Sequence, residues 1–310
     1  MNFFENTALN TTSIKLFNTK IHEWIGFMPE FQQSLGNICM FPEFSMKVLN
    51  KCIKTNTNSN KHIYLMAILS IFRHKREMLC DSPIENIDIL REKWVKIFYE
   101  NEQPIIDRRL ENTPTDKQNE KGGSKISFNQ IVLKRDELPF GSIERLLLSM
   151  YTMIPPARAD YFATQLVTNQ TPTQKNYINL TKMECILTDF KTAKTYKQIT
   201  HVFPEELITE LNESLKLTPR SYLFLNANGK PHTRNSFVLW ARRCLSRIFE
   251  TDFTLVFFRH AYITNYISTI DPNTVTDGQI KEMSDKLGHS PEMFRAYKWI
   301  KSGVTDEVTD

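Results

Sequence analysis

Five side chains in the second half of this 310-residue chain could together carry out phosphoryl transfer. They are two arginines, a lysine, a histidine and a tyrosine, namely Arg158, Lys191, Arg259, His289 and Tyr297. The planar fork of arginine suits two oxygens of a phosphate, and lysine is a point charge that can also donate a proton. A tyrosine can act as a covalent nucleophile, but its phenol is neutral at pH 7, so nearby cations must favour the attacking phenolate. The set predicts metal-free transfer of a phosphoryl group from DNA to tyrosine, with the arginines stabilising the five-coordinate phosphorus.

Arg259 is the most informative of these residues taken singly. It interrupts a strongly apolar run, directly after residues 255–258. A guanidinium in so much apolar surface is costly to bury unless it meets an anion. A buried arginine–carboxylate pair is the structural alternative, and Arg158 has the same alternative with Asp160 as its partner.

The stretch before Tyr297 predicts a tight corner between two helices. Gly288 can take the positive φ that a helix C-terminus needs. Ser290 is typical of the N-cap of a new helix, with Pro291 at its first position. His289 then lies in the corner, and Tyr297 lies about two turns into the second helix. An ordinary helical hairpin with a core tyrosine and a capping histidine is the alternative.

The elements that must position these residues are mainly helical. Apolar residues at helical spacing predict helices near residues 12–28, near 61–79 and from Ser82 onward, so that residues 1–111 form a helical domain. Residues 112–127 are polar, charged and glycine-containing, and they predict a flexible linker.

Residues 128–310 predict a domain that is mainly α with a small antiparallel β-sheet. Strand patterns occur at 177–180, 184–187, 197–202 and, more weakly, 222–225. Helices are expected at 143–153, 204–217, 232–249, 254–269, 276–287 and 291–300. Lys191 falls on the hairpin between the second and third strands. One helix carries a basic set that could contact a DNA backbone, although a solvated helix face explains it as well: Arg234, Arg242, Arg243 and Arg247.

Composition sets the broad class. The chain is 41% hydrophobic and 24% charged, which is typical of a globular protein. A net charge of +4 is compatible with a nucleic-acid partner without requiring one. The five scattered cysteines, with no zinc-knuckle spacing and no secretory signal, favour reduced thiols in an intracellular protein of the cytoplasm, nucleus or a viral replication compartment. No glycine-rich phosphate loop occurs, and no transmembrane helix is expected.

Residues 125–300 resemble the catalytic domain of the tyrosine recombinases, the phage-integrase family. That family has Arg…Lys…(His-x-x)-Arg…[His/Trp]…Tyr in this order, usually with Leu-Gly-His-Ser before the nucleophile. The matching positions are Arg158, Lys191, Arg259, His289 and Tyr297, with Lys194 as a competitor of Lys191. Arg259 stands in Phe-Arg-His-Ala-Tyr-Ile-Thr, similar to the family's Leu-Arg-His-[Ser/Thr]-Phe-x-Thr. The form that these motifs take in this chain resembles that of recombinases from mobile elements and large DNA viruses.

The sequence also departs from the family pattern. Val256 stands where a histidine or lysine usually precedes the second arginine, and it can neither bind a phosphate nor move a proton. The acidic residue that follows the first arginine comes one position early, at Asp160. Both departures bear on the rate, or on activity itself.

The resemblance implies a site-specific recombinase or integrase. It would cut and rejoin double-stranded DNA at a specific site through a 3′-phosphotyrosyl link to Tyr297, without cofactor, metal or ATP. Lys191 would protonate the leaving oxygen, and the non-bridging oxygens would be bound by Arg158, Arg259 and His289. Residues 1–111 would be the core-binding domain, and residues 128–310 the catalytic domain. A homotetramer on two DNA sites is implied, with the tail 298–310 docking on a neighbour.

Two rival functions stay open at this point. A type IB topoisomerase shares the site but reseals the same strand as a monomer. A catalytically impaired DNA-binding protein derived from a recombinase is favoured by Val256.

Overall fold

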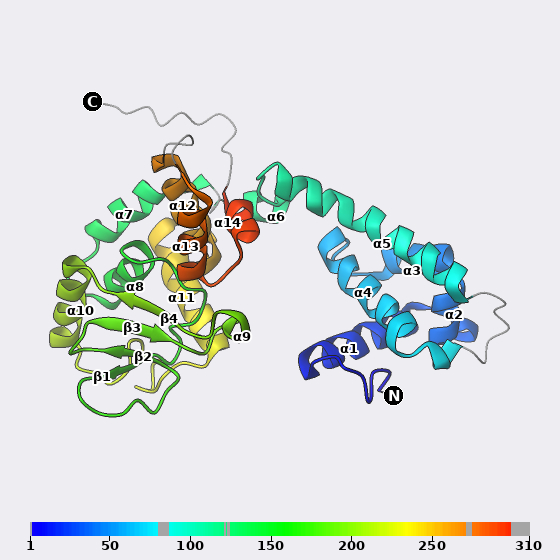
Figure 1. Cartoon of the computed structure of the whole chain (residues 1–310), viewed down its shortest axis with the longest axis horizontal. Coiled ribbons are helices and arrows are strands. Elements are labelled where there is room, and N and C mark those ends of the chain that lie inside the picture. Colours follow the sequence, from blue (N-terminus) through cyan, green and yellow to red (C-terminus); the bar gives the residue numbers. More distant parts are fainter. Residues whose placement is uncertain (1, 80–86, 121, 123–124, 271–274, 299–310) are drawn as a thin grey trace. The chain divides into compact units, whose positions relative to one another are not determined.

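The protein is described from a computed structural model. The described residues are 2–79, 87–120, 122, 125–270 and 275–298. The chain divides into two compact units, Met1–Leu110 and Glu111–Asp310 (Figure 1). Within the described ranges, no helix is both long enough and apolar enough to cross a bilayer.

The first unit is built from helices. They are α1 (Thr11–Phe27), η1 (Glu30–Gln32), α2 (Leu35–Met40), α3 (Pro42–Cys52), α4 (Asn58–His74), η2 (Arg76–Leu79) and α5 (Ile87–Leu110). Trp24 of α1 and Trp94 of α5 are fully buried and meet edge to face, with ring centroids 5.7 Å apart. Their indole N–H groups donate to the carbonyl oxygens of Ser45 and Cys39, so both polar atoms are satisfied inside an apolar core.

The helices expected in this unit are present with shifted ends. α1 matches the helix predicted near residues 12–28. The helix predicted near 61–79 is α4, which ends at His74 and is followed by a 3₁₀ turn. The predicted start at Ser82 lies outside the described residues, and α5 is described from Ile87.

The stretch expected to be a flexible linker, residues 112–127, belongs to the second unit and contains more regular structure than its composition suggested. Helix α6 (Asp116–Glu120) lies within the stretch expected to be a flexible linker. Ser127 then caps α7 (Phe128–Glu137) through a capping box with Gln130.

The second unit holds a small four-stranded sheet in the order β1-β2-β3-β4. Its strands are β1 (Gln165–Val167), β2 (Asn176–Asn179), β3 (Glu184–Leu187) and β4 (Ile199–Val202). β2, β3 and β4 are antiparallel as predicted, but β1 pairs with β2 in parallel, so the sheet is mixed. The strand expected at 222–225 makes only isolated bridges, from Tyr222 to Gln165 and from Leu225 to Pro231.

Helices make up most of the rest of this unit and lie mainly to one side of the sheet, so the unit is mainly helical as expected (Figure 1). They are α7, α8 (Ile143–Thr152), α9 (Ala193–Tyr196), α10 (Glu205–Leu217), α11 (Arg234–Phe249), α12 (Leu255–Thr269), α13 (Asp277–Leu287) and α14 (Pro291–Tyr297). α8 packs against α7, α10 and α12. Tyr151, near the end of α8, is fully buried and stacks on Phe258 of α12 at 4.9 Å. This packing places the chain that follows α8 beside α12.

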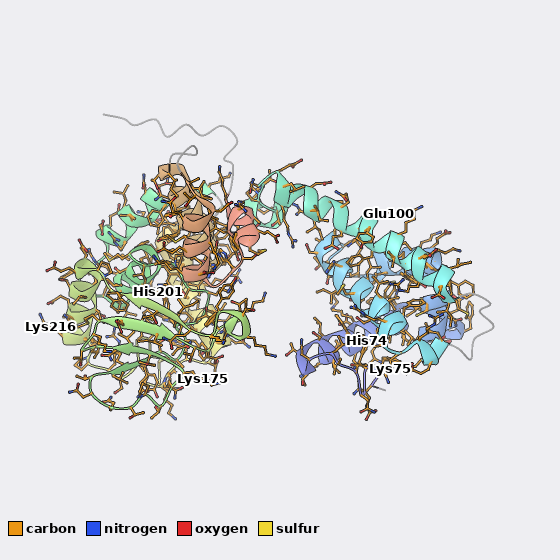
Figure 2. The ribbon with its side chains drawn as sticks, viewed as in Figure 1. His74, Lys75, Glu100, Lys175, His201 and Lys216 are labelled. Atoms are coloured by element: carbon orange, nitrogen blue, oxygen red, sulfur yellow. The ribbon has the colours of Figure 1, made fainter. Side chains whose placement is uncertain are left out.

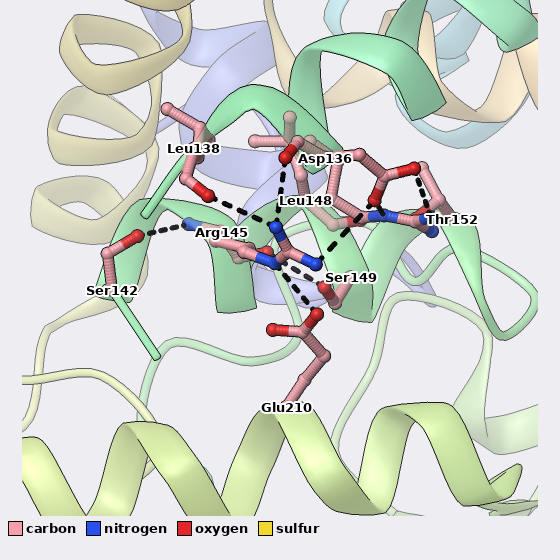
Figure 3. A network of polar contacts seen from close by, with 9 residues as sticks. Asp136, Leu138, Ser142, Arg145, Leu148, Ser149, Thr152 and Glu210 are labelled. Carbon is pink, nitrogen blue, oxygen red and sulfur yellow. Dashed lines mark hydrogen bonds and ion pairs between the residues drawn. The ribbon is translucent and has the colours of Figure 1, made fainter. Parts of the chain in front are cut away.

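A buried ion pair fixes α8 to α10 (Figure 3). Nε of Arg145 lies 2.7 Å from Oε1 of Glu210, and Nη1 donates to the carbonyl oxygens of Asp136 at 3.0 Å and Leu138 at 3.1 Å. Glu210 is 4% exposed, and its Oε2 has no partner among the described residues. Because Arg145 is the cation that pairs with Glu210 among the described residues, the pair holds α8 in place.

Replacing the cation of this pair should destabilise the second unit. In Arg145→Met the carboxylate of Glu210 stays buried without a counter-charge, and we expect the free energy of unfolding to fall by about 3 kcal/mol. Urea unfolding followed by circular dichroism measures the change. Lys216→Met, which removes an exposed cation paired with Glu213 on the same helix α10, is the matched control and should leave the midpoint nearly unchanged. Equal midpoints for the two variants would contradict this role of Arg145.

Candidate active site

Arg259 lies at the centre of the candidate site. Its side chain is 2% exposed, and its hydrogen bonds go to backbone oxygens: Nη1 donates to Pro156 at 3.1 Å and Nη2 to Leu287 at 2.7 Å. Nε has no partner among the described residues. No carboxylate of the described residues forms an ion pair with it, so the alternative of a buried arginine–carboxylate pair does not describe Arg259. The guanidinium is held, but its charge is not neutralised.

The two carbonyls that bind Arg259 belong to the segments carrying other predicted site residues. Pro156 lies two positions before Arg158, in the turn that follows α8. Leu287 ends α13, two positions before His289. One guanidinium therefore fixes both segments against α12.

Arg158 is half-buried, and its guanidinium makes no hydrogen bond or ion pair with the described residues. The expected alternative partner, Asp160, is buried and engaged elsewhere. Its Oδ2 accepts the backbone N–H of Arg158 at 3.1 Å, while its Oδ1 lies 2.8 Å from Nη2 of Arg234. Tyr151 donates its hydroxyl to the carbonyl oxygen of Arg158. The backbone at Arg158 is thus fixed while its charged end is unpaired.

The two arginines are electrostatically linked. Burial, and then the charge of Arg158, lower the pKa of Arg259 to about 10. Two guanidinium groups that disfavour each other's charge would both be stabilised by an anion placed between or beside them.

The predicted corner between α13 and α14 is present. Gly288 has φ +64°, and Ser290 caps α14 by accepting the N–H of Met293 at 3.3 Å, with Pro291 at the first helical position. The glycine is also needed for space, since a Cβ there would lie 2.9 Å from Cδ1 of Ile199 on β4. The corner therefore packs directly on the β3–β4 hairpin.

His289 and Tyr297 lie together at this corner, as the spacing predicted. Their rings stack with centroids 5.4 Å apart and an interplanar angle of 16°. Cζ of Arg259 lies 5.5 Å from the centre of the Tyr297 ring. His289 is 3% exposed, its Nδ1 lies 3.2 Å from the carbonyl oxygen of Ser290, and its Nε2 has no partner among the described residues. Arg259, His289 and Tyr297 thus form one contiguous group.

Lys191 and Lys194 both lie in the connection between the antiparallel strands β3 and β4, so the hairpin placement predicted for Lys191 is confirmed. Both are exposed, and no hydrogen bond or ion pair joins either ammonium to a described residue. Thr192, between them, donates its hydroxyl to the carbonyl oxygen of Gly288 at 2.6 Å. This bond ties the lysine-bearing loop to the corner that holds His289, without selecting between the two lysines.

The basic face expected on α11 is mostly engaged in ion pairs. Arg234 binds Asp160 as described. Arg242 binds Asp252 through two hydrogen bonds, from Nε to Oδ1 at 2.7 Å and from Nη2 to Oδ2 at 2.8 Å. Arg247 lies 2.8 Å from Glu144. Arg243 is exposed and has no ion pair with the described residues. Arg234 therefore shapes the Arg158 turn, a role that its position on a surface helix did not suggest.

One further residue at the site was noted in the sequence only as the neighbour of Arg259 and was given no role of its own. His260, next to Arg259 on α12, is 8% exposed; its Nδ1 lies 2.9 Å from the carbonyl oxygen of Tyr297, and the two rings lie 4.6 Å apart. Its sequence signal is its place directly after Arg259 in the Phe-Arg-His-Ala-Tyr-Ile-Thr run. Val256, where the family pattern has a polar residue, is 49% exposed in the first turn of α12.

The buried histidines of this unit are held in the neutral state. Burial, then the charges of Arg259 and Arg158, lower the pKa of His289 to about 3. Burial also lowers the pKa of His260 to about 4, and that of His201 on β4 to about 4 (Figure 2). Across the described residues, no group of three or more histidine, cysteine or acidic side chains is arranged to hold a metal ion.

These pKa shifts make stability depend on pH. In the unfolded chain the imidazoles of His201, His260 and His289 bind protons near pH 6.5, whereas in the folded state they stay neutral to about pH 4. Their contribution is complete above pH 6.5 and is lost as the pH falls. Between pH 6.5 and 5 we expect the free energy of unfolding to drop by about 1–2 kcal/mol per histidine. Urea unfolding at several pH values tests this, and His201→Asn should reduce the slope. A free energy that is the same at pH 6.5 and pH 5 would contradict neutral buried imidazoles.

Comparison with known proteins finds similar solved structures but no similar sequence family. No protein-family model matches the chain, and no curated protein is similar to it. A crystal structure of XerA recombinase is similar over 92% of this chain and 95% of its own, with a TM-score of 0.41 and 14% sequence identity. A likeness of this degree does not assign a family, so the chemistry rests on the residues of the site.

Proposed function

We propose that this protein is a DNA strand-exchange enzyme that cuts and rejoins DNA through a covalent bond between Tyr297 and a 3′-phosphate. The observation that carries the proposal is the set of unsatisfied cationic and polar groups around one phenol. Arg259 is buried without a carboxylate, Arg158 is unpaired among the described residues, and Nε2 of His289 is buried without a partner there. A phosphodiester supplies the negative oxygens that these groups lack.

The first chemical step follows from these positions. The phenolic oxygen of Tyr297 attacks phosphorus, a bond between oxygen and phosphorus forms, and the bond to the 5′-oxygen breaks. The phenolic proton passes to solvent, and the guanidinium groups of Arg158 and Arg259 favour the attacking phenolate. A bound phosphodiester is an anion beside His289 and favours the imidazolium, so Nδ1 keeps its bond to the carbonyl oxygen of Ser290 and Nε2 donates to a non-bridging oxygen.

The leaving oxygen also needs a proton. The ammonium of Lys191 donates it and is reprotonated from solvent, so a free 5′-hydroxyl is released. Rejoining is the reverse: a 5′-hydroxyl attacks the phosphotyrosyl bond and Tyr297 leaves. The energy of the broken phosphodiester is kept in the protein–DNA bond, so the step consumes no ATP.

The wider proposal covers partners and assembly. Residues 1–111 form the DNA-binding domain and residues 128–310 the catalytic domain, acting on a specific double-stranded site. Binding rests mainly on phosphate contacts, to which Lys194 and Arg243 contribute, so affinity falls steeply with salt. Two DNA sites are joined by a homotetramer, in an integration or excision reaction of a viral or other mobile element. The tail expected to dock on a neighbour lies, after Lys298, outside the described residues.

A second candidate is a DNA-binding protein that no longer cuts. The specific observation in its favour is Val256, a half-exposed apolar side chain one helical turn before Arg259. A relaxing activity of the type IB topoisomerase kind would instead give a covalent adduct but no exchange between two duplexes.

Covalent capture tests the proposal. The protein is incubated with a pool of nicked duplexes carrying a randomised central segment, so that cleavage releases a short fragment and traps the adduct. We expect adducts resistant to denaturant, with a recoverable sequence preference. Tyr297→Phe should give none, and Arg259→Ala should slow adduct formation about 100-fold or more, because a buried cation facing the transferred phosphate is lost. Exposed Tyr99→Phe is the control and should behave as the unmodified protein.

Each other outcome has a definite meaning. An adduct that persists in Tyr297→Phe rules out the nucleophile, and no adduct in the unmodified protein favours the binding-only protein. A supercoil-relaxation assay and a strand-exchange assay on the recovered sequence then separate topoisomerase from recombinase.

The choice between Lys191 and Lys194 can be tested through the leaving group. A duplex with sulfur in place of the 5′-bridging oxygen releases a thiolate, which needs no proton donor at pH 7. We expect Lys191→Ala to slow cleavage of the ordinary duplex about 100-fold and to cleave the sulfur duplex at nearly the normal rate. Lys194→Ala, measured with the duplex saturated by protein, should cleave both duplexes at close to the normal rate, because a lost phosphate contact then affects only binding. If the sulfur duplex restored normal cleavage to Lys194→Ala and not to Lys191→Ala, the proton donor would be Lys194.

A further inference from the structure

The helix that carries Tyr297 is short and ends at that residue. α14 spans only Pro291–Tyr297, and the carbonyl groups of its last turn receive a single backbone bond at the cap, from the N–H of Lys298 to the carbonyl oxygen of Arg295 at 3.2 Å, among the described residues. Phe294 anchors the middle of the helix and is fully buried. The position of the backbone at Tyr297 therefore depends on donors that other segments bring to the carbonyl end.

Two side chains from other segments supply these donors. His260 of α12 directs Nδ1 to the carbonyl oxygen of Tyr297 at 2.9 Å. The side-chain nitrogen of Asn112 donates to the carbonyl oxygens of Arg295 at 2.8 Å and Lys298 at 3.1 Å, in the amide orientation that satisfies these groups. The last turn of α14 is thereby held from two sides.

Asn112 occupies a particular place in the chain. The first unit and helix α5 both end at Leu110, and only Glu111 separates that end from Asn112. The backbone of Asn112 has φ +53°, a left-handed conformation that asparagine adopts more readily than most residues. The side chain that reaches α14 thus belongs to the first residues after the first unit.

We propose that Asn112 is a positioning residue that ties the start of the second unit to the helix carrying Tyr297. The inference rests on the proposed function and deepens it. With the amide in place, the last turn of α14 is fixed and the phenol is held against Arg259 and His289. Without it, that turn loses two hydrogen bonds and the phenol is less often in position.

The variants follow from the backbone conformation. Asn112→Gly removes the amide and tolerates the same φ, so it deletes the contact without backbone strain. Asn112→Asp keeps the shape but turns a carboxylate oxygen towards two carbonyl oxygens. Asn6→Gly is the matched control, because Asn6 is an exposed asparagine of the first unit with φ +60°.

Two measurements are made on the full chain. Hydrogen exchange followed by mass spectrometry should show amides at the end of α14 exchanging about fivefold to tenfold faster in Asn112→Gly and Asn112→Asp, with α8 and α10 unchanged. On the duplex recovered by covalent capture, the single-turnover rate of adduct formation should fall about tenfold in both variants, while the Kd for that duplex stays within about twofold. Asn6→Gly should match the unmodified protein in both.

The outcomes separate this inference from the proposed function. If the unmodified protein gives no adduct, the proposed function fails, and the positioning role falls with it. If the adduct forms but Asn112→Gly leaves either the exchange or the cleavage rate unchanged, the proposed function stands and the inference is wrong. A loss of DNA affinity equal to the loss of rate would also overturn it, because Asn112 would then act in binding.

Discussion

A buried guanidinium that forms no ion pair with the described residues is the constraint around which the second unit is arranged. Arg259 sits among fully buried aromatic residues of α12 and α8, where an unpaired charge is costly. Its hydrogen bonds to Pro156 and Leu287 compensate part of that cost and, in doing so, join the segments that carry Arg158 and His289. An anion bound beside Arg259 would offset the remaining cost, so the site favours an anionic ligand.

The neighbouring charged side chains leave this preference for an anion in place. The nearest acidic side chain of the Arg158 turn, Asp160, is occupied by the backbone of Arg158 and by the guanidinium of Arg234. His289 stays neutral because it is buried beside cations. The corner at Gly288 brings the ring of Tyr297 against this group, and Thr192 fixes the lysine-bearing hairpin to the same corner. The arrangement is electropositive at the point where the phenol lies.

Local features of the sequence predicted much of this arrangement. The corner could be predicted because Gly288, Ser290 and Pro291 act through their own backbone conformations. The mainly helical character followed from apolar spacing along each helix. The three-residue strand β1 is too short for a periodic pattern, and its parallel pairing depends on a tertiary contact. The partner of Asp160 could not be predicted for the same reason, since Arg234 is distant in the chain. The contacts of His260 and Asn112 with α14 likewise arise only when separate segments pack together.

The central claim is that a phosphate of the DNA binds the guanidinium of Arg259. Selective nitrogen-15 labelling of arginine side chains allows the Nε–H signal of Arg259 to be followed by NMR, with Arg259→Lys providing the assignment. On addition of inorganic phosphate, and more strongly of a short duplex, that signal should move in a saturable manner, because Nε has no partner among the described residues. A signal that stays fixed at saturating duplex, while those of surface arginines such as Arg243 move, would contradict the account.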